Sequence, residues 1–303
     1  MIKANNLQKN YGKRTAVDNI SFKVETGKVT GFLGPNGAGK STTMRLMLGL
    51  DIGKGKTTFD DKKLVDYNQP SKVVGILLEA KAFHPTRTAR NHLKVLATEG
   101  NIPLSRVDEV LDIVGLKSEA KGKPGKFSLG MSQRLGIAAA LLGNPKYLIL
   151  DEPANGLDPE GIVWLREFLK SYADEGNAVF VSSHLLSEMS QMADNVIVIG
   201  KGKLIANTSI KQLISSNDKG GVFIRTSKQS EFEKVLTAKK LQYDKFENGL
   251  MLTGVKTDEI GKLAFDSKIP ILELAKHNAS LEEVFLDITN GSEEFASSKK
   301  DKS

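Results

Sequence analysis

GPNGAGKST, residues 34–42, is the stretch that decides the fold of this chain. The spacing of its glycines, lysine and serine fits G-x-x-x-x-G-K-[S/T], the pattern of a phosphate-binding loop. An apolar, strand-like VTGFL precedes it and a helix-like TMRLMLGL follows it, which is the context that such a loop requires. The stretch therefore predicts a strand–loop–helix unit that binds the phosphates of a nucleotide.

Each part of this loop has a predicted task. Glycines let backbone N–H groups converge on phosphate oxygens, and the start of the following helix adds the positive end of its dipole. We expect the Lys40 ammonium to reach the β- and γ-phosphates and the Ser41 hydroxyl to ligate Mg²⁺. The predicted cofactor-binding residues of the loop are Gly34, Pro35, Asn36, Gly37, Ala38, Gly39, Lys40, Ser41 and Thr42.

Polar residues end two further apolar stretches, YLILDEP (residues 147–153) and VFVSSH (residues 179–184). Carboxylates at a strand end beside a phosphate loop lie where Mg²⁺ and an attacking water must be held. Asp151 is predicted to support the metal, and Glu152 to act as the general base toward the water. His184 is predicted to bond to the γ-phosphate or the water. An ordinary acidic turn and a surface histidine are the alternative interpretations.

The remaining pattern predicts two domains. IVWLREFLKSY, between YLILDE and NAVFVSS, predicts a strand–helix–strand unit and hence a parallel sheet. This first domain covers about residues 1–215, with a helical insertion at about residues 78–142, in which Ser105 is predicted to cap a helix.

The second predicted domain covers residues 218–290. Its order of strand, helix, strand, strand, helix, strand predicts a small ferredoxin-like α+β fold. A last helix is predicted to begin at Ser280, because S-L-E-E has the form of a capping box. Residues 291–303 are predicted to be a disordered tail.

Composition limits the kinds of protein this chain can be. Its 303 residues contain no cysteine, which excludes disulfides, thiolate metal sites and a cysteine nucleophile. Because no apolar run approaches about 18 residues and the first residues lack a signal-peptide pattern, a soluble cytoplasmic chain is expected. The net charge of +7 comes from basic residues scattered among acidic ones, so no nucleic-acid partner is expected.

These motifs together resemble those of the ABC transporter ATPases. GPNGAGKST resembles the phosphate loop of that family, YLILDEP its metal-and-base strand, SSH its switch histidine, NGLD (residues 155–158) its D-loop and FSLGMSQR (residues 127–134) its signature, usually LSGGQxQR. The resemblance covers about residues 1–215 and implies a Mg²⁺-dependent ATPase with an inserted helical subdomain. By position, Tyr11 matches the aromatic residue that stacks on adenine; the alternative is an ordinary strand tyrosine.

The resemblance also implies partners. In the family two nucleotide-binding domains pack head to tail, and the signature of each closes over the ATP of the other. It therefore assigns Ser128, Gly130 and the D-loop residue Asp158 to a shared ATP site; a helix cap within one fold is the alternative for Ser128. The expected partners are a second nucleotide-binding subunit, identical or different, and an integral membrane permease that holds the chain at the inner face of the membrane.

Two features depart from the family pattern. The signature has Leu129 where glycine is usual and Met131 where glutamine is usual, and a Cβ at Leu129 restricts the loop. Glu79 takes the place of the glutamine that contacts the metal. A carboxylate is still a hard oxygen ligand for Mg²⁺, so Glu79 is predicted to be a metal residue; an unrelated surface acid is the alternative.

This glutamate, the SLGM signature and the C-terminal SLEEVFLDIT resemble one branch of the family, which serves exporters with separate membrane subunits, including bacitracin- and lantibiotic-resistance pumps. This narrower resemblance implies efflux of antimicrobial peptides or drugs. The alternative is a soluble ABC ATPase that acts on ribosomes or DNA. Translation-type members carry two such domains in one chain, whereas this sequence has one phosphate loop. Chromosome-type members insert a long coiled coil, for which the distance from Lys40 to Ser128 leaves no room.

Overall fold

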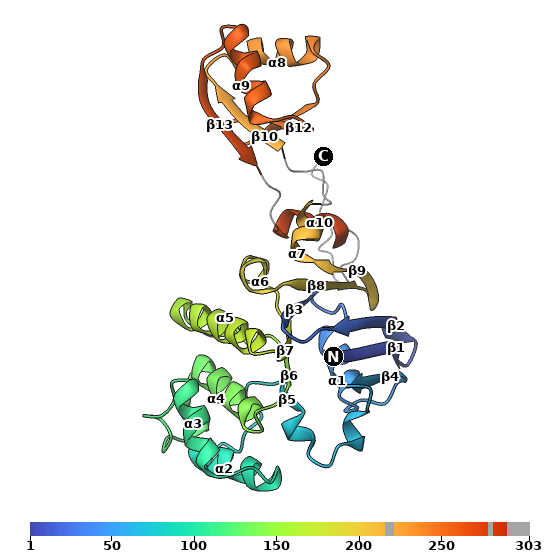
Figure 1. The fold of residues 1–303 in the computed structure, drawn as a ribbon, viewed down its shortest axis with the longest axis vertical. Coiled ribbons are helices and arrows are strands. Elements are labelled where there is room, and N and C mark those ends of the chain that lie inside the picture. Colours follow the sequence, from blue (N-terminus) through green and yellow to red (C-terminus); the bar gives the residue numbers. More distant parts are fainter. Residues whose placement is uncertain (216–220, 278–280, 290–303) are drawn as a thin grey trace, which may run out of the picture. The chain divides into compact units, whose positions relative to one another are not determined.

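The computed structural model describes residues 1–215, 221–277 and 281–289. It divides into two compact units, one built mainly from residues 1–210 and the other from residues 211–287 (Figure 1). The boundary between the units falls at residue 210, whereas the sequence predicted that the first domain ends at about residue 215.

A six-stranded sheet forms the centre of the first unit, in the order β5-β6-β7-β3-β8-β9. All neighbouring strands are parallel except β9, which pairs antiparallel with β8 as a hairpin. Its strands are β3 (Lys28–Leu33), β5 (Val74–Leu77), β6 (Tyr147–Leu150), β7 (Ala178–Ser182), β8 (Asn195–Gly200) and β9 (Lys203–Ser209). The inner strands are continuous apolar runs because both faces of the sheet are covered. The predicted parallel sheet is confirmed.

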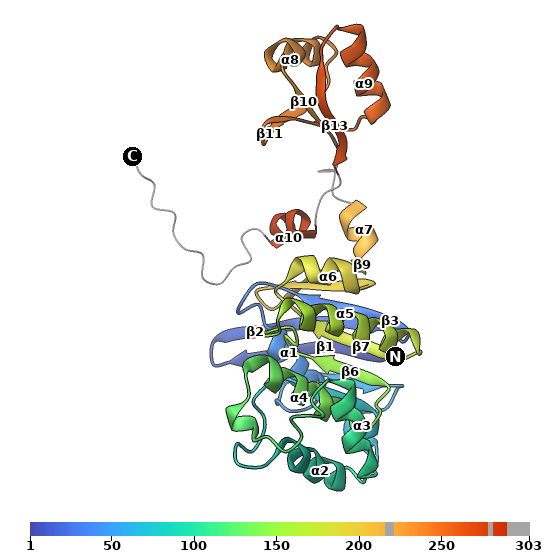
Figure 2. The same cartoon turned by 90° about the vertical axis from the view of Figure 1, so that its left-hand side faces the viewer.

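A second sheet of three antiparallel strands, in the order β2-β1-β4, covers one face of the first. Its strands are β1 (Ile2–Tyr11), β2 (Arg14–Val24) and β4 (Lys54–Phe59). Helix α1 (Lys40–Met47) lies on the same side, and helices α4 (Leu129–Leu141) and α5 (Pro159–Asp174) cover the opposite face (Figure 2). Helix α6 (Leu186–Met192) packs beside α5.

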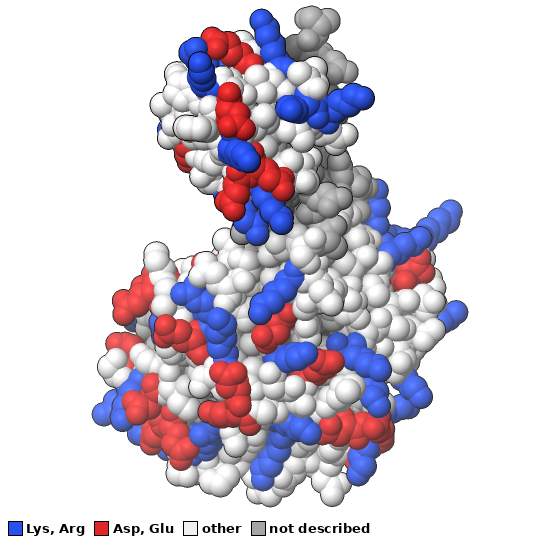
Figure 3. All heavy atoms as spheres, turned by 45° about the horizontal axis from the view of Figure 1, so that its top comes forward, with Lys and Arg blue, Asp and Glu red and all other residues white. Residues whose placement is uncertain are grey.

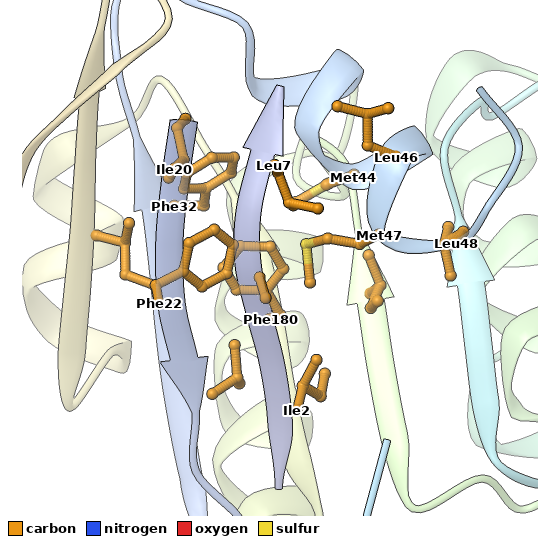
Figure 4. Close-up of a cluster of buried hydrophobic side chains, with 14 of the residues drawn as sticks. Ile2, Leu7, Ile20, Phe22, Phe32, Met44, Leu46, Met47, Leu48 and Phe180 are labelled. Carbon is orange, nitrogen blue, oxygen red and sulfur yellow. The ribbon is translucent and has the colours of Figure 1, made fainter. Parts of the chain in front are cut away.

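Three phenylalanines join the two sheets in one core (Figure 4). Phe22 belongs to β2, Phe32 to β3 and Phe180 to β7, and their ring centroids lie 5.0–5.9 Å apart. All three side chains are buried, as are Met44 and Met47 of α1 beside them. The strand that ends at Tyr11 and the strand that leads into the phosphate loop therefore share one packed interior.

The middle of the chain is helical. Its helices are α2 (Ala89–Glu99), α3 (Ser105–Ile113) and α4, and short 3₁₀ turns lie at Leu64–Asp66, Pro70–Lys72 and Pro124–Lys126. Thr88 caps α2 by accepting a hydrogen bond from the backbone N–H of Asn91. The predicted cap at Ser105 was wrong, because Ser105 is already the first helical residue and Leu104 holds the cap position without a side-chain bond.

The second unit contains a four-stranded sheet in the order β11-β12-β10-β13, with every pair antiparallel. Its elements are β10 (Gly221–Thr226), α8 (Gln229–Ala238), β11 (Tyr243–Phe246), β12 (Gly249–Thr253), α9 (Thr257–Asp266) and β13 (Ile271–His277); α7 (Ile210–Ser215) and α10 (Leu281–Thr289) flank them. The element order agrees with the prediction, while the ferredoxin-like classification stays a prediction. The predicted cap Ser280 and tail 291–303 lie outside the described residues.

Candidate functional site

The phosphate loop follows β3 and leads into α1. Gly37 and Gly39 have φ angles of +80° and +103°, a left-handed conformation that favours glycine. A Cβ on Gly39 would lie 2.4 Å from the Ala16 carbonyl oxygen, so a side chain at this position would push the loop off β2. At these two glycines the loop thus presents bare backbone, to which a phosphate can come close.

Lys40 is buried, and its Nζ donates a hydrogen bond to the Gly34 carbonyl oxygen over 2.8 Å. The same Nζ lies 3.9 Å from Oε1 of Glu152. Burial lowers the pKa of Lys40, and the carboxylates of Glu152 and Asp151 oppose that shift. The ammonium therefore lies within ion-pair distance of Glu152 at the edge of the phosphate loop.

A cavity of about 360 Å³ opens over this loop. It is lined by Tyr11, Arg14, Ala16, the loop residues 36–42, Asp151 and Glu152. Tyr11 ends β1 with 51% of its surface exposed, and its hydroxyl donates to Asp51 over 3.1 Å. The exposed aromatic ring can stack on a base and the glycine-rich loop can bind phosphates, so the cavity suits a nucleotide.

Ser182 holds the two acids in place. Its buried hydroxyl donates to Oδ1 of Asp151 over 2.5 Å and accepts from the backbone N–H of Glu152 over 2.8 Å. The parallel pairing of β6 with β7 sets Leu150 opposite Val181, so the next residues of both strands meet at the sheet edge. Sequence reasoning missed Ser182, although its place at the end of an apolar strand was a usable signal.

His184 contacts the carboxylate of Glu152. Its Nδ1 lies 2.7 Å from Oε2, and its backbone N–H donates to the same oxygen over 3.2 Å. The imidazole is half exposed and is not among the residues that line the phosphate-loop cavity. In this structure His184 therefore contacts the predicted base rather than the space for the γ-phosphate.

Glu79 follows β5 and is exposed. It lines a second cavity, of about 500 Å³, together with Ser41 and Asp151, so the three predicted metal residues border one space. Within the described residues no cluster of three His, Asp or Glu side chains forms a metal cage. The hydroxyl and carboxylate oxygens present suit Mg²⁺ if nucleotide phosphates complete its coordination, which is the usual way this ion is bound.

The signature residues lie away from the chain's own phosphate loop. Ser128 caps α4 by accepting from the Met131 N–H over 3.1 Å, and Asp158 caps α5 by accepting from the Gly161 N–H over 3.0 Å. A Cβ on Gly130 would lie 2.7 Å from the Gly156 carbonyl oxygen. Ser128, Gly130 and Asp158 are absent from the lining of the phosphate-loop cavity.

Leu129, one of the departures from the family pattern, packs on the loop of residues 155–158. A Cβ on Gly156 would fall 2.4–2.8 Å from the side-chain atoms of Leu129, and Gly156 has a φ of +77°. The larger signature residue thus fits here because its neighbour is glycine.

A glycine-rich loop between a parallel strand and a helix, with two acids at the end of another strand of the same sheet, defines the class of P-loop ATPases. The model of the family described as ABC transporter matches residues 17–155, and a model described as a domain of unknown function matches residues 220–282. The chain belongs to the ABC transporter ATP-binding proteins, and it is an ATPase of the ABC type.

Several proteins are similar to this chain over two thirds of its length or more. The bacitracin transport ATP-binding protein BcrA of Bacillus licheniformis is 37% identical over 96% of this chain and 98% of its own length. The lantibiotic transport ATP-binding protein SrtF of Streptococcus pyogenes is 42% identical over 68% of this chain and 89% of its own. A bacterial ABC transporter cassette solved as a dimer matches with a TM-score of 0.63 and 25% identity over 69% of this chain and 99% of its own.

Two surface properties bear on partners. Within residues 1–215, 221–277 and 281–289, no helix is both long and apolar enough to span a bilayer. On the face drawn in Figure 3, Lys and Arg alternate with Asp and Glu and form no continuous basic stripe.

Proposed function

We propose that this chain is the ATP-hydrolysing motor subunit of a membrane exporter, and that antimicrobial peptides are its class of transported substrate. The relatives BcrA and SrtF, named for bacitracin and lantibiotic transport, support this choice of substrate. They also favour transport over the alternative of a soluble ATPase that acts on ribosomes or DNA.

One observation carries the mechanism: the residues expected around one ATP are divided between two places on the chain. The phosphate loop, Tyr11 and the two acids line one cavity, whereas Ser128 and Asp158 do not reach it. Two copies packed head to tail would bring the signature of each over the cavity of the other. The solved dimer of a related cassette supports this arrangement.

Ser41, Asp151 and Glu79 would hold Mg²⁺ together with phosphate oxygens, and the ion would neutralise charge at the γ-phosphate. The Lys40 ammonium binds the β- and γ-phosphates from the loop side. The Glu152 carboxylate accepts a proton from the attacking water, and His184 orients that carboxylate through the contact at Oε2.

The face around Glu79 is our candidate for contact with the permease. The 500 Å³ cavity is lined by Ser41 and Asp151 and also by residues of the following loop and α2, Phe83, His92 and Leu96. A movement of the loop and α2 would therefore change the shape of the cavity that the metal residues also line. Binding to a permease here would hold the chain at the cytoplasmic face of the membrane.

The composite site is tested with Glu152→Gln, which keeps the size of the side chain but cannot accept the proton. ATP should persist in this variant, and a dimer should accumulate with ATP but not with ADP at sedimentation equilibrium. Adding Ser128→Arg places a bulky cation where the partner's phosphate must approach. The dimer should then disappear while each monomer still binds ATP through Lys40. Loss of ATP binding by the monomer would instead assign Ser128 to its own chain's site. If the natural partner is a different ATPase chain, the test is repeated with that chain.

The exporter role is tested by coexpression with a neighbouring gene that encodes a protein of several membrane helices. The chain should sediment with membranes only when that gene is present, and the pair should raise the bacitracin or lantibiotic concentration that cells tolerate. Lys40→Ala in the same pair is the control that should remove resistance. Sedimentation with ribosomes, independent of the membrane gene, would favour the alternative function.

A further inference from the structure

Gln133 links the signature helix to the predicted catalytic base within one chain. It lies in the second turn of α4, is 4% exposed, and its Nε2 donates to the backbone carbonyl oxygen of Glu152 over 3.0 Å. A carbonyl oxygen only accepts hydrogen bonds, so the chemistry fixes which side of the amide faces Glu152. The catalytic roles of Lys40, Glu152 and His184 do not involve this contact.

The backbone of Glu152 needs such support. Its φ of +50° lies in the left-handed region, where a residue with a side chain is held only if its surroundings determine its conformation. Its N–H is held by Ser182 and its carboxylate by His184, both at the end of β7. Gln133 holds the third polar group, the carbonyl, and it does so from a different part of the fold.

We propose that Gln133 is a positioning residue that sets the orientation of Glu152 according to the position of the signature helix. The inference rests on the proposed composite site. Ser128, at the start of α4, would meet the partner's γ-phosphate, and Gln133 follows five residues later on the same rigid helix. ATP bound in the partner's site therefore helps to align the base that acts in this chain's own site.

The oxygen atom of the Gln133 amide indicates that this side chain does not serve stability alone. Oε1 of Gln133 is buried and has no hydrogen-bond partner within the described part of the chain. An unpaired buried acceptor destabilises a fold, so a side chain needed only for packing would be better apolar. Methionine has a similar length and no such acceptor, and Gln133→Met should fold as well as the native chain.

A matched control exists in the same region. The Nη2 of Arg106 on α3 donates to the carbonyl oxygen of Leu141 at the far end of α4 over 3.4 Å, and its Nε is likewise buried without a partner among the described residues. Arg106→Met therefore also removes a side-chain bond to a backbone carbonyl, here at the C-terminal end of α4, together with the ion pair of Arg106 with Glu109. Arg106 contacts neither acid of the site.

The experiment measures steady-state ATP hydrolysis and thermal unfolding of the full-length chain. Gln133→Met should lower kcat about 10- to 100-fold, as expected for a misplaced catalytic group, and leave KM for ATP within about twofold. Its Tm should stay within about 3 °C of the native value. Arg106→Met should shift Tm at least as much but keep kcat within about twofold. Native kcat in Gln133→Met, or an equal loss in Arg106→Met, overturns the proposal.

Gln133→Glu supplies a second readout that packing alone would not give. A buried carboxyl has a raised pKa, and its protonated form can donate to the Glu152 carbonyl as the amide does. Its kcat relative to the native chain should therefore rise as pH falls from about 8.5 to about 6, whereas the ratio for Gln133→Met stays flat. Flat ratios for both variants count against positioning. Failure of the dimer test with Glu152→Gln would remove the composite site, which is a separate result.

Discussion

Ser182→Ala tests whether one hydroxyl holds both acids of the site. The substitution removes the bond to Asp151 Oδ1 at 2.5 Å and the bond from the Glu152 N–H at 2.8 Å. Each lost partner leaves a largely buried polar group, at about 1–3 kcal/mol. We therefore expect the free energy of unfolding to fall by about 3 kcal/mol, which corresponds to a Tm lower by about 6–12 °C in a unit of this size. Because both acids lose their orientation, kcat should fall about 10- to 100-fold.

Ser183→Ala is the control, since Ser183 is the adjacent residue and is also buried. Its Oγ accepts a bond from the nearby Leu185 N–H over 2.9 Å, and within the described residues it bonds to neither acid. The loss should be about 1 kcal/mol of stability with kcat close to native. Urea unfolding without nucleotide and ATP turnover under saturating MgATP measure the two effects separately. Equal losses of kcat in both variants, or native turnover in Ser182→Ala, would refute the reasoning.

Four further outcomes are expected. Lys40→Ala should abolish ATP binding or hydrolysis, measured by turnover, because it removes the charge that cradles the phosphates. Tyr11→Ala should weaken ATP about tenfold in a binding titration but leave free triphosphate nearly unchanged, because only base stacking, about 1–3 kcal/mol, is lost; equal losses would move the adenine site elsewhere. Glu79→Gln should keep hydrolysis within a few-fold, since it retains an oxygen ligand, whereas Glu79→Ala should lower hydrolysis or its coupling to export; a fully active alanine variant would make Glu79 a bystander. Gly156→Ala should cost about 2–3 kcal/mol in urea unfolding through its φ of +77° and its clash with Leu129, and adding Leu129→Gly should recover at least about 1 kcal/mol.

The sequence predicted the parts of the fold that carry long apolar patterns. It missed β4 because that strand begins Lys-Gly-Lys and is exposed there, with only Thr57 and Phe59 buried. It missed β5 because a strand of four residues at the edge of the sheet gives too short a pattern. Edge strands are determined by their neighbours, which a local pattern does not contain.

The site was predictable where a residue's role depends on its place in a motif. The phosphate loop, Tyr11, Asp151 and Glu152 line one cavity, as the sequence indicated. Ser182 and Gln133 were not predicted, because their contacts depend on strand register and helix packing between residues 19 to 31 positions apart. Leu129 was expected to restrict its loop, but its packing on Gly156 requires the folded structure.

The aromatic core between the two sheets helps to set the distance between the two ends of the nucleotide site. Tyr11 stands on one sheet and the phosphate loop on the other, and Phe22, Phe32 and Phe180 fix the interval between them (Figure 4). Close-packed interiors compress little, so the distance between Tyr11 and the phosphate loop should change little when a ligand binds. A base stacked on Tyr11 and a phosphate bound at the loop are therefore held at a set separation. The spacing of the two ends of the nucleotide site thus depends partly on side chains that do not line it.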